Sequence, residues 1–192
     1  MLLFITGGAR SGKSRFAEAC ASRLASSGLY VATAQLYDSE MEERARLHQE
    51  RRASSGFAWT VREEPLVLSE LLRHPAAFAA PEFPAPGVIL IDCLTLWLTN
   101  WLLKLEQEGR VAELLDVIEE LGTALAACPL PIIAVSNEVG DGIVPEYPLG
   151  RLFRDYAGML NQRVARQSDR AFLVTAGIPV DLKRLEFPLE DL

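Results

Sequence analysis

The stretch FITGGARSGKS, residues 4–14, decides the fold of this chain. The apolar run Leu2 to Ile5 predicts a buried strand, which leads directly into the pattern G-x-x-x-x-G-K-S between Gly7 and Ser14. Glycines allow a turn in which successive backbone N–H groups point at an anion, and the helix that follows adds the positive end of its dipole. The stretch therefore predicts a phosphate-binding loop, in which Lys13 reaches the outer phosphates and Ser14 ligates magnesium.

The pattern is specific. With glycine at about 7% of average composition, its four fixed positions arise by chance in a chain this long on the order of one time in a hundred. The alternative is a glycine-rich turn that only connects a strand to a helix. Such a turn requires neither a lysine nor a hydroxyl at the start of the helix, so nucleotide phosphate binding is favoured.

Composition limits the class of protein. The chain has 192 residues, 49% of them hydrophobic, which suffices for a substantial core, and we predict a single domain over residues 1–192. A net charge of −7 argues against a protein that binds nucleic acid through a basic surface. Cys20, Cys93 and Cys128 lack metal-ligand spacing and lie in apolar sequence, which is typical of reduced thiols. With no signal peptide and no apolar run of membrane-spanning length, a cytoplasmic protein without a membrane span is expected.

Strand and helix patterns alternate along the chain. Continuous apolar runs bounded by turn residues predict buried strands, and longer stretches with helical periodicity predict the helices between them. This alternation predicts an α/β fold with a doubly wound, mostly parallel sheet, similar to P-loop NTPases. A proline-rich surface loop is expected at 74–87. Beyond the first strand, the predicted strands are 29–34, 57–61, 88–92, 131–136 and, as the final one, 171–175, and the predicted helices are 13–25, 38–52, 65–73, 94–105, 111–127 and 149–167.

Asp92 ends an otherwise apolar strand pattern that begins at Val88. Strands of this kind are buried on both faces of a parallel sheet, and their carboxyl ends line the site. Asp92 is therefore placed to hold magnesium, directly or through water. The alternative is that Asp92 only caps the helix that follows. The presence of a phosphate loop favours the interpretation of Asp92 as a metal ligand.

His48 lies in the charged helix predicted at 38–52. At helical spacing its neighbours are Arg44, Arg51 and Arg52, so its imidazole would stand among three guanidinium groups. Such a cluster suits an anion, and cationic neighbours would keep the imidazole neutral and nucleophilic. The alternative is a merely solvated helix, with acids in its first turn and bases in its last. Spacing alone favours that alternative.

Two further features are interpreted as structural. Trp97 and Trp101 lie on one face of a predicted helix, which indicates packing in the core or against another subunit. His74, beside Pro75 at the edge of the proline-rich loop, is expected on the surface.

Short stretches spread over nearly the whole chain share one resemblance. They are GGARSGKSR at 7–15, ATA at 32–34, Glu40-Met41 through Arg44 to His48 with Arg51-Arg52, Trp59 followed by Glu63, NEVG at 137–140, GIVPE at 142–146, FRDYAG at 153–158 with Asn161-Gln162, and AGIP at 176–179. Together they resemble the adenosylcobinamide kinase/adenosylcobinamide-phosphate guanylyltransferase family of cobalamin biosynthesis. The stretches after the phosphate loop are far more specific than the loop itself.

The resemblance implies two reactions and their cofactors, GTP, ATP and Mg²⁺. A nucleoside triphosphate phosphorylates adenosylcobinamide, and GMP then passes from GTP to the new phosphate through a guanylyl-histidine at His48, giving adenosylcobinamide-GDP. Lys13 would assist by offsetting charge on phosphate oxygens. The implied metal ligands are Ser14 and Asp92, and the implied assembly is a homotrimer. The implied nucleotide contacts are Gly7, Gly8, Ala9, Arg10, Ser11, Gly12, Lys13, Ser14, Ala32, Thr33, Ala34, Gln49, Glu50, Arg51, Arg52, Glu63 and Asp92.

Two alternatives stay open. One is a P-loop small-molecule kinase without nucleotidyl transfer, in which His48 only binds or does nothing. The other is a GTP-binding regulatory module, which would need a guanine-specifying N-K-x-D element. The comparable strand end reads Asn137-Glu138-Val139-Gly140 instead, which lowers the second alternative considerably.

Overall fold

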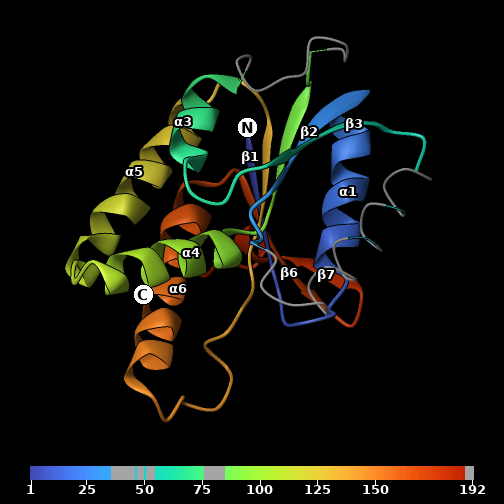
Figure 1. The fold of residues 1–192 in the computed structure, drawn as a ribbon. Helices are drawn as coiled ribbons and strands as arrows, with labels where there is room; N and C mark the ends of the chain where they lie inside the picture. The colour runs from blue at the N-terminus through green and yellow to red at the C-terminus, as the bar shows by residue number, and fades with distance from the viewer. Residues whose placement is uncertain (36–45, 47–49, 51–54, 76–84, 189–192) are drawn as a thin grey trace.

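The computed structural model describes residues 1–35, 46, 50, 55–75 and 85–188. Seven strands form one sheet in the order β3-β2-β4-β5-β1-β6-β7 (Figure 1). Every neighbouring pair is parallel except β6 and β7. The strands are β1 (Leu2–Thr6), β2 (Ser27–Ala32), β3 (Ala58–Glu63), β4 (Val88–Asp92), β5 (Ile132–Val135), β6 (Arg170–Thr175) and β7 (Ile178–Asp181).

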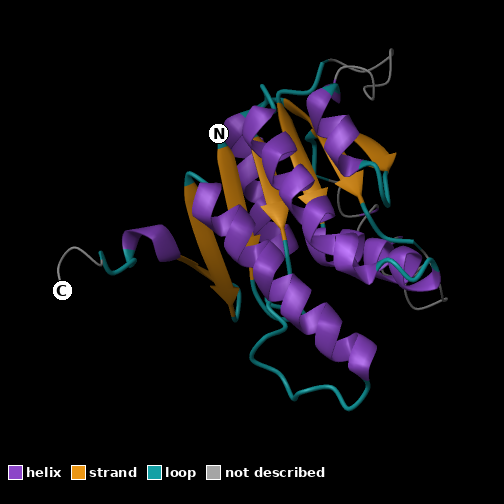
Figure 2. Cartoon of the chain, turned by 90° about the vertical axis from the view of Figure 1, so that its left-hand side faces the viewer, coloured by secondary structure: helices purple, strands orange, loops and turns teal. Residues whose placement is uncertain are grey.

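Helices cover both faces of the sheet, as Figures 1 and 2 show. In the part of the chain that is described, α1 lies on one face and α3, α4, α5 and α6 on the other. This layering confirms the predicted doubly wound α/β fold. The helices are α1 (Lys13–Leu24), α3 (Leu68–Arg73), α4 (Leu94–Gln107), α5 (Leu114–Ala127) and α6 (Pro148–Gln167), with short 3₁₀ turns η2 (Val111–Glu113) and η3 (Leu182–Arg184).

Strand β1 shows how the sheet divides the core. Successive side chains of a strand point to opposite faces. Leu2 and Phe4 join the large cluster under α3 to α6, whereas Leu3 and Ile5 join the smaller cluster under α1. All of its residues are buried, as expected of a strand covered on both faces.

Strand β7 corrects the prediction that 171–175 is the last strand. Ala176 and Gly177 have φ values of 52° and 81°, so the chain reverses in a tight turn and returns antiparallel to β6. β7 is short, contains Pro179 and lies mostly exposed at the sheet edge. It therefore lacks the apolar run that identifies the buried strands.

Helix α3 begins at Leu68, three residues later than the predicted start at Pro65. The carboxylate of Glu64 accepts the N–H groups of Leu66 at 3.2 Å and Val67 at 2.9 Å. These bonds hold the segment in a turn instead of a first helical turn. The other predicted boundaries differ by a few residues, and the helix predicted at 111–127 divides into η2 and α5.

The two tryptophans of α4 pack into the core. Both indole N–H groups donate to the carbonyl of Leu66, at 3.1 Å from Trp97 and 3.0 Å from Trp101. Trp97 is fully buried, and Trp101 is partly buried against the same core cluster. His74 is exposed, as predicted. Most of the predicted helix 38–52 and of the loop 74–87 lies outside the described residues.

Candidate active site

The predicted site residues of three strands lie in one row at the carboxyl edge of the sheet. Ala32 at the end of β2 pairs with Glu63 on one side and with Asp92 on the other. Asp92 pairs in turn with Val135, which pairs with Ile5 just before the phosphate loop. Parallel strands bring these ends together, and this edge is where ligands bind in such sheets.

The phosphate loop has a shape that glycine permits. Gly12, at the start of α1, has φ 96°. A Cβ on Gly7, whose φ is 155°, would lie 2.4 Å from the carbonyl oxygen of Val174 and 2.8 Å from the hydroxyl of Ser11. That hydroxyl is buried and, among the described residues, makes no hydrogen bond. The loop therefore offers a tight cradle with a free hydroxyl, which suits an anion.

The turn between β6 and β7 supports this loop from behind. The N–H of Gly177 donates to the carbonyl of Ser11 at 2.8 Å, and a Cβ on Gly12 would lie 3.3 Å from the Cα of Gly177. The sequence assigned no role to Gly177. Ala-Gly before a Pro-containing strand is a turn signal that could have identified a hairpin, but the contact with the phosphate loop is tertiary.

Lys13 is held over the loop. Its side chain is 9% exposed, and its ammonium donates to the carbonyl of Gly8 at 3.0 Å. Burial lowers the pKa of Lys13 below its ordinary value, while Cys93 and Asp92 act in the opposite direction. The buried cation thus faces the strand end that carries the predicted metal ligand.

Asp92 does not cap helix α4. The N-terminal cap position is Cys93, and no side chain caps the helix there. A carboxylate oxygen of Asp92 instead accepts the hydroxyl of Tyr30 at 2.8 Å. The capping alternative is therefore not supported, and Tyr30, a residue of β2 that the sequence analysis passed over, orients this carboxylate.

A hydrogen-bonded cluster joins the ends of β2 and β4. The hydroxyl of Thr33 donates to the carbonyl of Cys93 at 2.6 Å and accepts the N–H of the same residue at 2.9 Å. Asn100 of α4 donates to the carbonyls of Thr33 at 2.8 Å and Pro65 at 3.0 Å. Burial chiefly, with the charge of Asp92, raises the pKa of Cys93 to about 11. The predicted contact residue Thr33 thus uses its side chain to hold the strand ends, and Cys93 stays a neutral thiol.

A second buried cluster fixes the residue after β5. The hydroxyl of Ser136 donates to the side-chain carbonyl of Asn161 at 2.6 Å. The same hydroxyl lies 3.3 Å from the hydroxyl of Thr95. Thr95 accepts the N–H of Asn137 at 2.7 Å, and the amide of Asn161 donates to the carbonyl of Asn137 at 3.0 Å. Asn161 lies among the apolar residues that α6 buries. A polar residue in such a stripe is the signal by which sequence could have found it.

The segment 138–147 follows the end of β5 and begins beside the phosphate loop. The N–H of Glu138 donates to the carbonyl of Gly7 at 3.1 Å. The guanidinium of Arg151 donates to the carbonyls of Pro145 at 3.1 Å and Glu146 at 2.6 Å, and Arg154 donates to that of Gly140. Residues 138–147, hereafter the 138–147 loop, are therefore fastened to the phosphate loop at one end and to α6 along their length.

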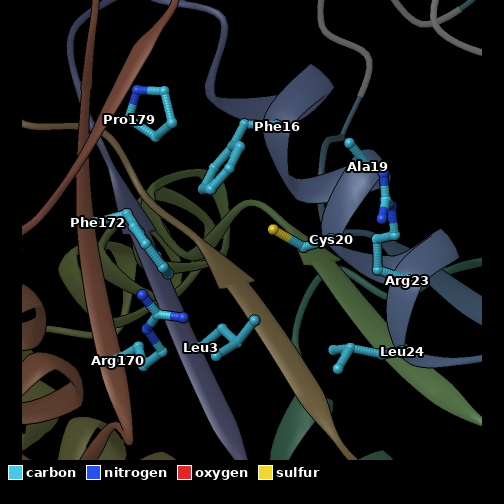
Figure 3. A pocket seen from close by; sticks show the side chains of 9 residues that line it. All are labelled: Leu3, Phe16, Ala19, Cys20, Arg23, Leu24, Arg170, Phe172 and Pro179. Carbon is cyan, nitrogen blue, oxygen red and sulfur yellow. The ribbon is translucent and has the colours of Figure 1, made fainter.

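A separate apolar groove of about 480 Å³ lies between α1 and strands β6 and β7 (Figure 3). Among the described residues, Arg23 and Arg170 are its only charged lining residues, and Arg170 is paired with Asp181 at 2.6 Å. None of the predicted site residues that the structure describes lines it, and Ala32, Glu63 and Asp92 lie at the carboxyl edge of the sheet instead. The lining residues are Leu3, Phe16, Ala19, Cys20, Arg23, Leu24, Arg170, Phe172 and Pro179.

Four predicted site residues lie outside the described residues: His48, Gln49, Arg51 and Arg52. Glu50 is exposed and forms an ion pair with Arg46 one helical turn earlier.

Comparison with known proteins identifies the family. A family model described as cobinamide kinase / cobinamide phosphate guanyltransferase matches residues 3–182, which include the whole edge described above. The chain belongs to this family. The predicted enzyme class, a kinase and nucleotidyltransferase of cobalamin biosynthesis, is thereby confirmed.

Curated relatives in the cobinamide kinase / guanyltransferase family are similar over nearly their full length. A protein of Pseudomonas aeruginosa named bifunctional adenosylcobalamin biosynthesis protein CobP is 42% identical over 93% of this chain and 95% of its own. Proteins named bifunctional adenosylcobalamin biosynthesis protein CobU from Salmonella typhimurium and Escherichia coli are 38% and 36% identical, each over 95% of this chain and 100% of its own.

A solved structure supports the fold alone. It is a prototypical ATPase of a type III secretion system, with a TM-score of 0.53 at 12% identity over 98% of this chain. The chain spans 59% of that protein's length. None of the helices in the part of this family member that is described has the length and apolarity to cross a membrane.

Proposed function

We propose that this chain carries out both reactions of its family, phosphorylating adenosylcobinamide at the phosphate loop and then transferring GMP to the product through His48. The observation that carries the proposal is the buried ammonium of Lys13, held over the glycine cradle beside the end of β4. A desolvated cation at that position stabilises negative charge that develops on transferring phosphate oxygens.

In the kinase step the hydroxyl oxygen of adenosylcobinamide attacks the γ-phosphorus of the nucleoside triphosphate. A new P–O bond forms, the bond to the β-phosphate oxygen breaks, the nucleoside diphosphate leaves, and the hydroxyl proton is released. The loop and Lys13 would hold the phosphates, since a glycine-rich loop before a helix offers backbone N–H groups to an anion and the ammonium of Lys13 lies over this loop.

In the guanylyl step a ring nitrogen of His48 attacks the α-phosphorus of GTP and expels pyrophosphate. A phosphate oxygen of adenosylcobinamide phosphate then attacks the same phosphorus, breaks the N–P bond and regenerates the imidazole. The support for His48 is the family resemblance together with its arginine neighbours Arg44, Arg51 and Arg52 in the sequence.

The donor set at the strand end fits magnesium. Ser14 and Asp92 supply a hydroxyl and a carboxylate, and Mg²⁺ prefers oxygen ligands, usually from one or two carboxylates with substrate phosphates and water. Among the described residues no three His, Cys, Asp or Glu side chains gather into a metal site, so phosphate and water would complete the shell. When bound, the ion would offset charge on the phosphate oxygens.

We further propose that the chain is one nucleotide-binding domain that acts as a cytoplasmic homotrimer. The single sheet supports one domain. Cys20, Cys93 and Cys128 are free, which suits a reducing compartment. The trimer rests on the family resemblance, and light scattering that gave a monomer mass would refute it.

The two histidines allow a matched test of the proposed intermediate. After incubation with α-labelled GTP and no acceptor, wild type and His74→Gln should carry one GMP per chain, because His74 is an exposed residue outside the site. His48→Gln should carry none while still phosphorylating adenosylcobinamide with ATP. A GMP adduct of undiminished yield on His48→Gln would refute the role of His48.

A further inference from the structure

The 138–147 loop combines a fixed shape with outward apolar side chains. Three large apolar side chains close together in the sequence are exposed: Ile143 at 95%, Val144 at 60% and Tyr147 at 65%. Figures 1 and 2 show the loop projecting from the carboxyl edge of the sheet before it reaches the start of α6. Neighbouring large apolar side chains in water mark an interaction site.

Inward contacts set the shape of the loop. Val139 packs against the main core cluster. Gly150, buried in the first turn of α6, leaves room for the loop, since a Cβ there would lie 2.6 Å from the ring of Tyr147 and 2.8 Å from Pro145. The bonds from Arg151 and Arg154 to loop carbonyls add to these contacts. The exposed side chains therefore stand on a supported platform.

The position of the loop suggests what covers it. Its first residue, Glu138, is hydrogen bonded to Gly7 of the phosphate loop. An acceptor hydroxyl must approach the transferred phosphorus to about 3–3.5 Å. The body of the acceptor must then lie against a surface near the phosphate loop, and the 138–147 loop begins beside that loop and projects from the same edge of the sheet.

We propose that the 138–147 loop binds the corrinoid acceptor, with Ile143, Val144 and Tyr147 against the methyl-bearing face of the macrocycle. The inference rests on the proposed kinase function and adds the surface that receives its substrate. A corrin ring offers a broad apolar face edged with amide side chains, which matches an apolar platform framed by loop backbone groups. Burying one large side chain in such a contact is worth about a factor of ten or more in affinity.

The test compares full-length variants Ile143→Ser and Tyr147→Ala with the control Leu185→Ser. Leu185 is also highly exposed, at 70%, but follows η3, which lies near the opposite end of β6. Adenosylcobinamide binding is measured by titration, KM and kcat by ATP-dependent phosphorylation, and nucleotide-site integrity by GMP labelling from GTP without acceptor.

We expect Ile143→Ser and Tyr147→Ala each to raise KM for adenosylcobinamide about tenfold, with KM for ATP and GMP labelling unchanged. Tyr147→Phe should retain the wild-type KM because its ring is kept. Unchanged corrinoid binding in both variants, or the same loss in Leu185→Ser, overturns the inference. Loss of the native oligomer by light scattering in the two variants also overturns it and makes the loop a subunit contact.

Two controls keep these outcomes distinct. If Ile143→Ser fails to fold by circular dichroism, Ile143→Thr gives the same comparison with a smaller change of shape. A wild-type protein that binds adenosylcobinamide but does not phosphorylate it would refute the proposed function, while the binding comparison would still decide the role of the loop.

Discussion

The phosphate loop and the 138–147 loop leave neighbouring strands at the same edge and are joined by the bond from Glu138 to Gly7, yet they are built differently. The phosphate loop is shaped by its glycines and holds a buried lysine. The 138–147 loop is supported by arginines from α6 and turns apolar side chains toward water. The first geometry suits a phosphate on any substrate, whereas the second suits one particular partner. Changes in the two loops should therefore separate the steps that need only nucleotide from those that need the acceptor.

The largest effect is expected in the phosphate loop, from Lys13→Ala. Removing a preorganised donor to a developing phosphate charge should slow both phosphorylation and GMP labelling by about a hundredfold or more. Single-turnover rates with ATP and with GTP measure this effect. Lys104→Ala is the control, since Lys104 is an exposed lysine of α4 whose ammonium lies 4.8 Å from the centre of the Trp101 ring. If Lys13→Ala slowed only the phosphorylation of adenosylcobinamide and left GMP labelling unchanged, the phosphate loop would not act on nucleotide alone, and the proposed distinction between the two loops would be wrong.

The second-largest effect is expected on stability, from the buried cluster of Thr95, Ser136 and Asn161 at the end of β5. Asn161→Leu removes the acceptor of the Ser136 hydroxyl, which keeps only the hydroxyl of Thr95 at 3.3 Å, and the donor to the partly buried carbonyl of Asn137. A buried polar group that loses its hydrogen bond costs about 1–3 kcal/mol. We expect a clearly lower free energy of unfolding in denaturant titrations. The exposed neighbour Gln162→Leu should change it by about 0.5 kcal/mol or less. Equal unfolding midpoints for the two variants would mean that the cluster does not hold this edge.

The phosphate loop could be predicted from sequence because its glycines, lysine and serine form one continuous pattern at 7–14. The strand end at Asp92 was predictable in the same way, from an apolar run that stops, whereas the strand predicted at 29–34 ends at Ala32. Tyr30, Asn100, Asn161 and Gly177 were missed because their partners lie far away along the chain. A tertiary contact has no local pattern beyond a polar residue in a buried stripe.

The 138–147 loop lies between the strand predicted at 131–136 and the helix predicted at 149–167, and its sequence carries part of the family resemblance. Its glycines and prolines indicate an irregular segment, but not that Ile143 would be almost fully exposed. Whether an apolar loop residue faces the core or water depends on the arginines and on Gly150, which lie later in the chain. Edge strand β7 was missed for a related reason, since its exposed residues give no apolar run.

A subtler effect should follow from Gly150→Ala, which changes the support of the 138–147 loop. The added methyl would meet Tyr147 and Pro145 at 2.6–2.8 Å, so the platform must shift. Such overpacking should raise KM for adenosylcobinamide about tenfold and leave GMP labelling intact. Gly158→Ala is a matched control in the same helix, where nothing lies within 4 Å, and it should stabilise the protein by about 0.5–1 kcal/mol. An unchanged KM for Gly150→Ala would show that the platform tolerates a change of shape.

The smallest expected effect is a pH dependence of stability and of nucleotide affinity, because Lys13 of the phosphate loop titrates. Burial lowers the pKa of Lys13 below 10.5, so the folded chain releases this proton at a lower pH than the unfolded chain does. Between the two pKa values the unfolded state binds more protons, and stability without nucleotide should rise with pH through that window. Nucleotide affinity should fall as the pH rises above the pKa of Lys13 in the nucleotide-free folded protein, by at most about tenfold per pH unit for one proton. Lys13→Arg should abolish the decline because arginine stays protonated. Adenosylcobinamide affinity, measured by titration without nucleotide on the Tyr147→Phe variant, should stay constant because its proposed contacts at 143, 144 and 147 then carry no titratable group. A parallel decline of both affinities in that variant would mean that the acceptor also depends on the charge of Lys13.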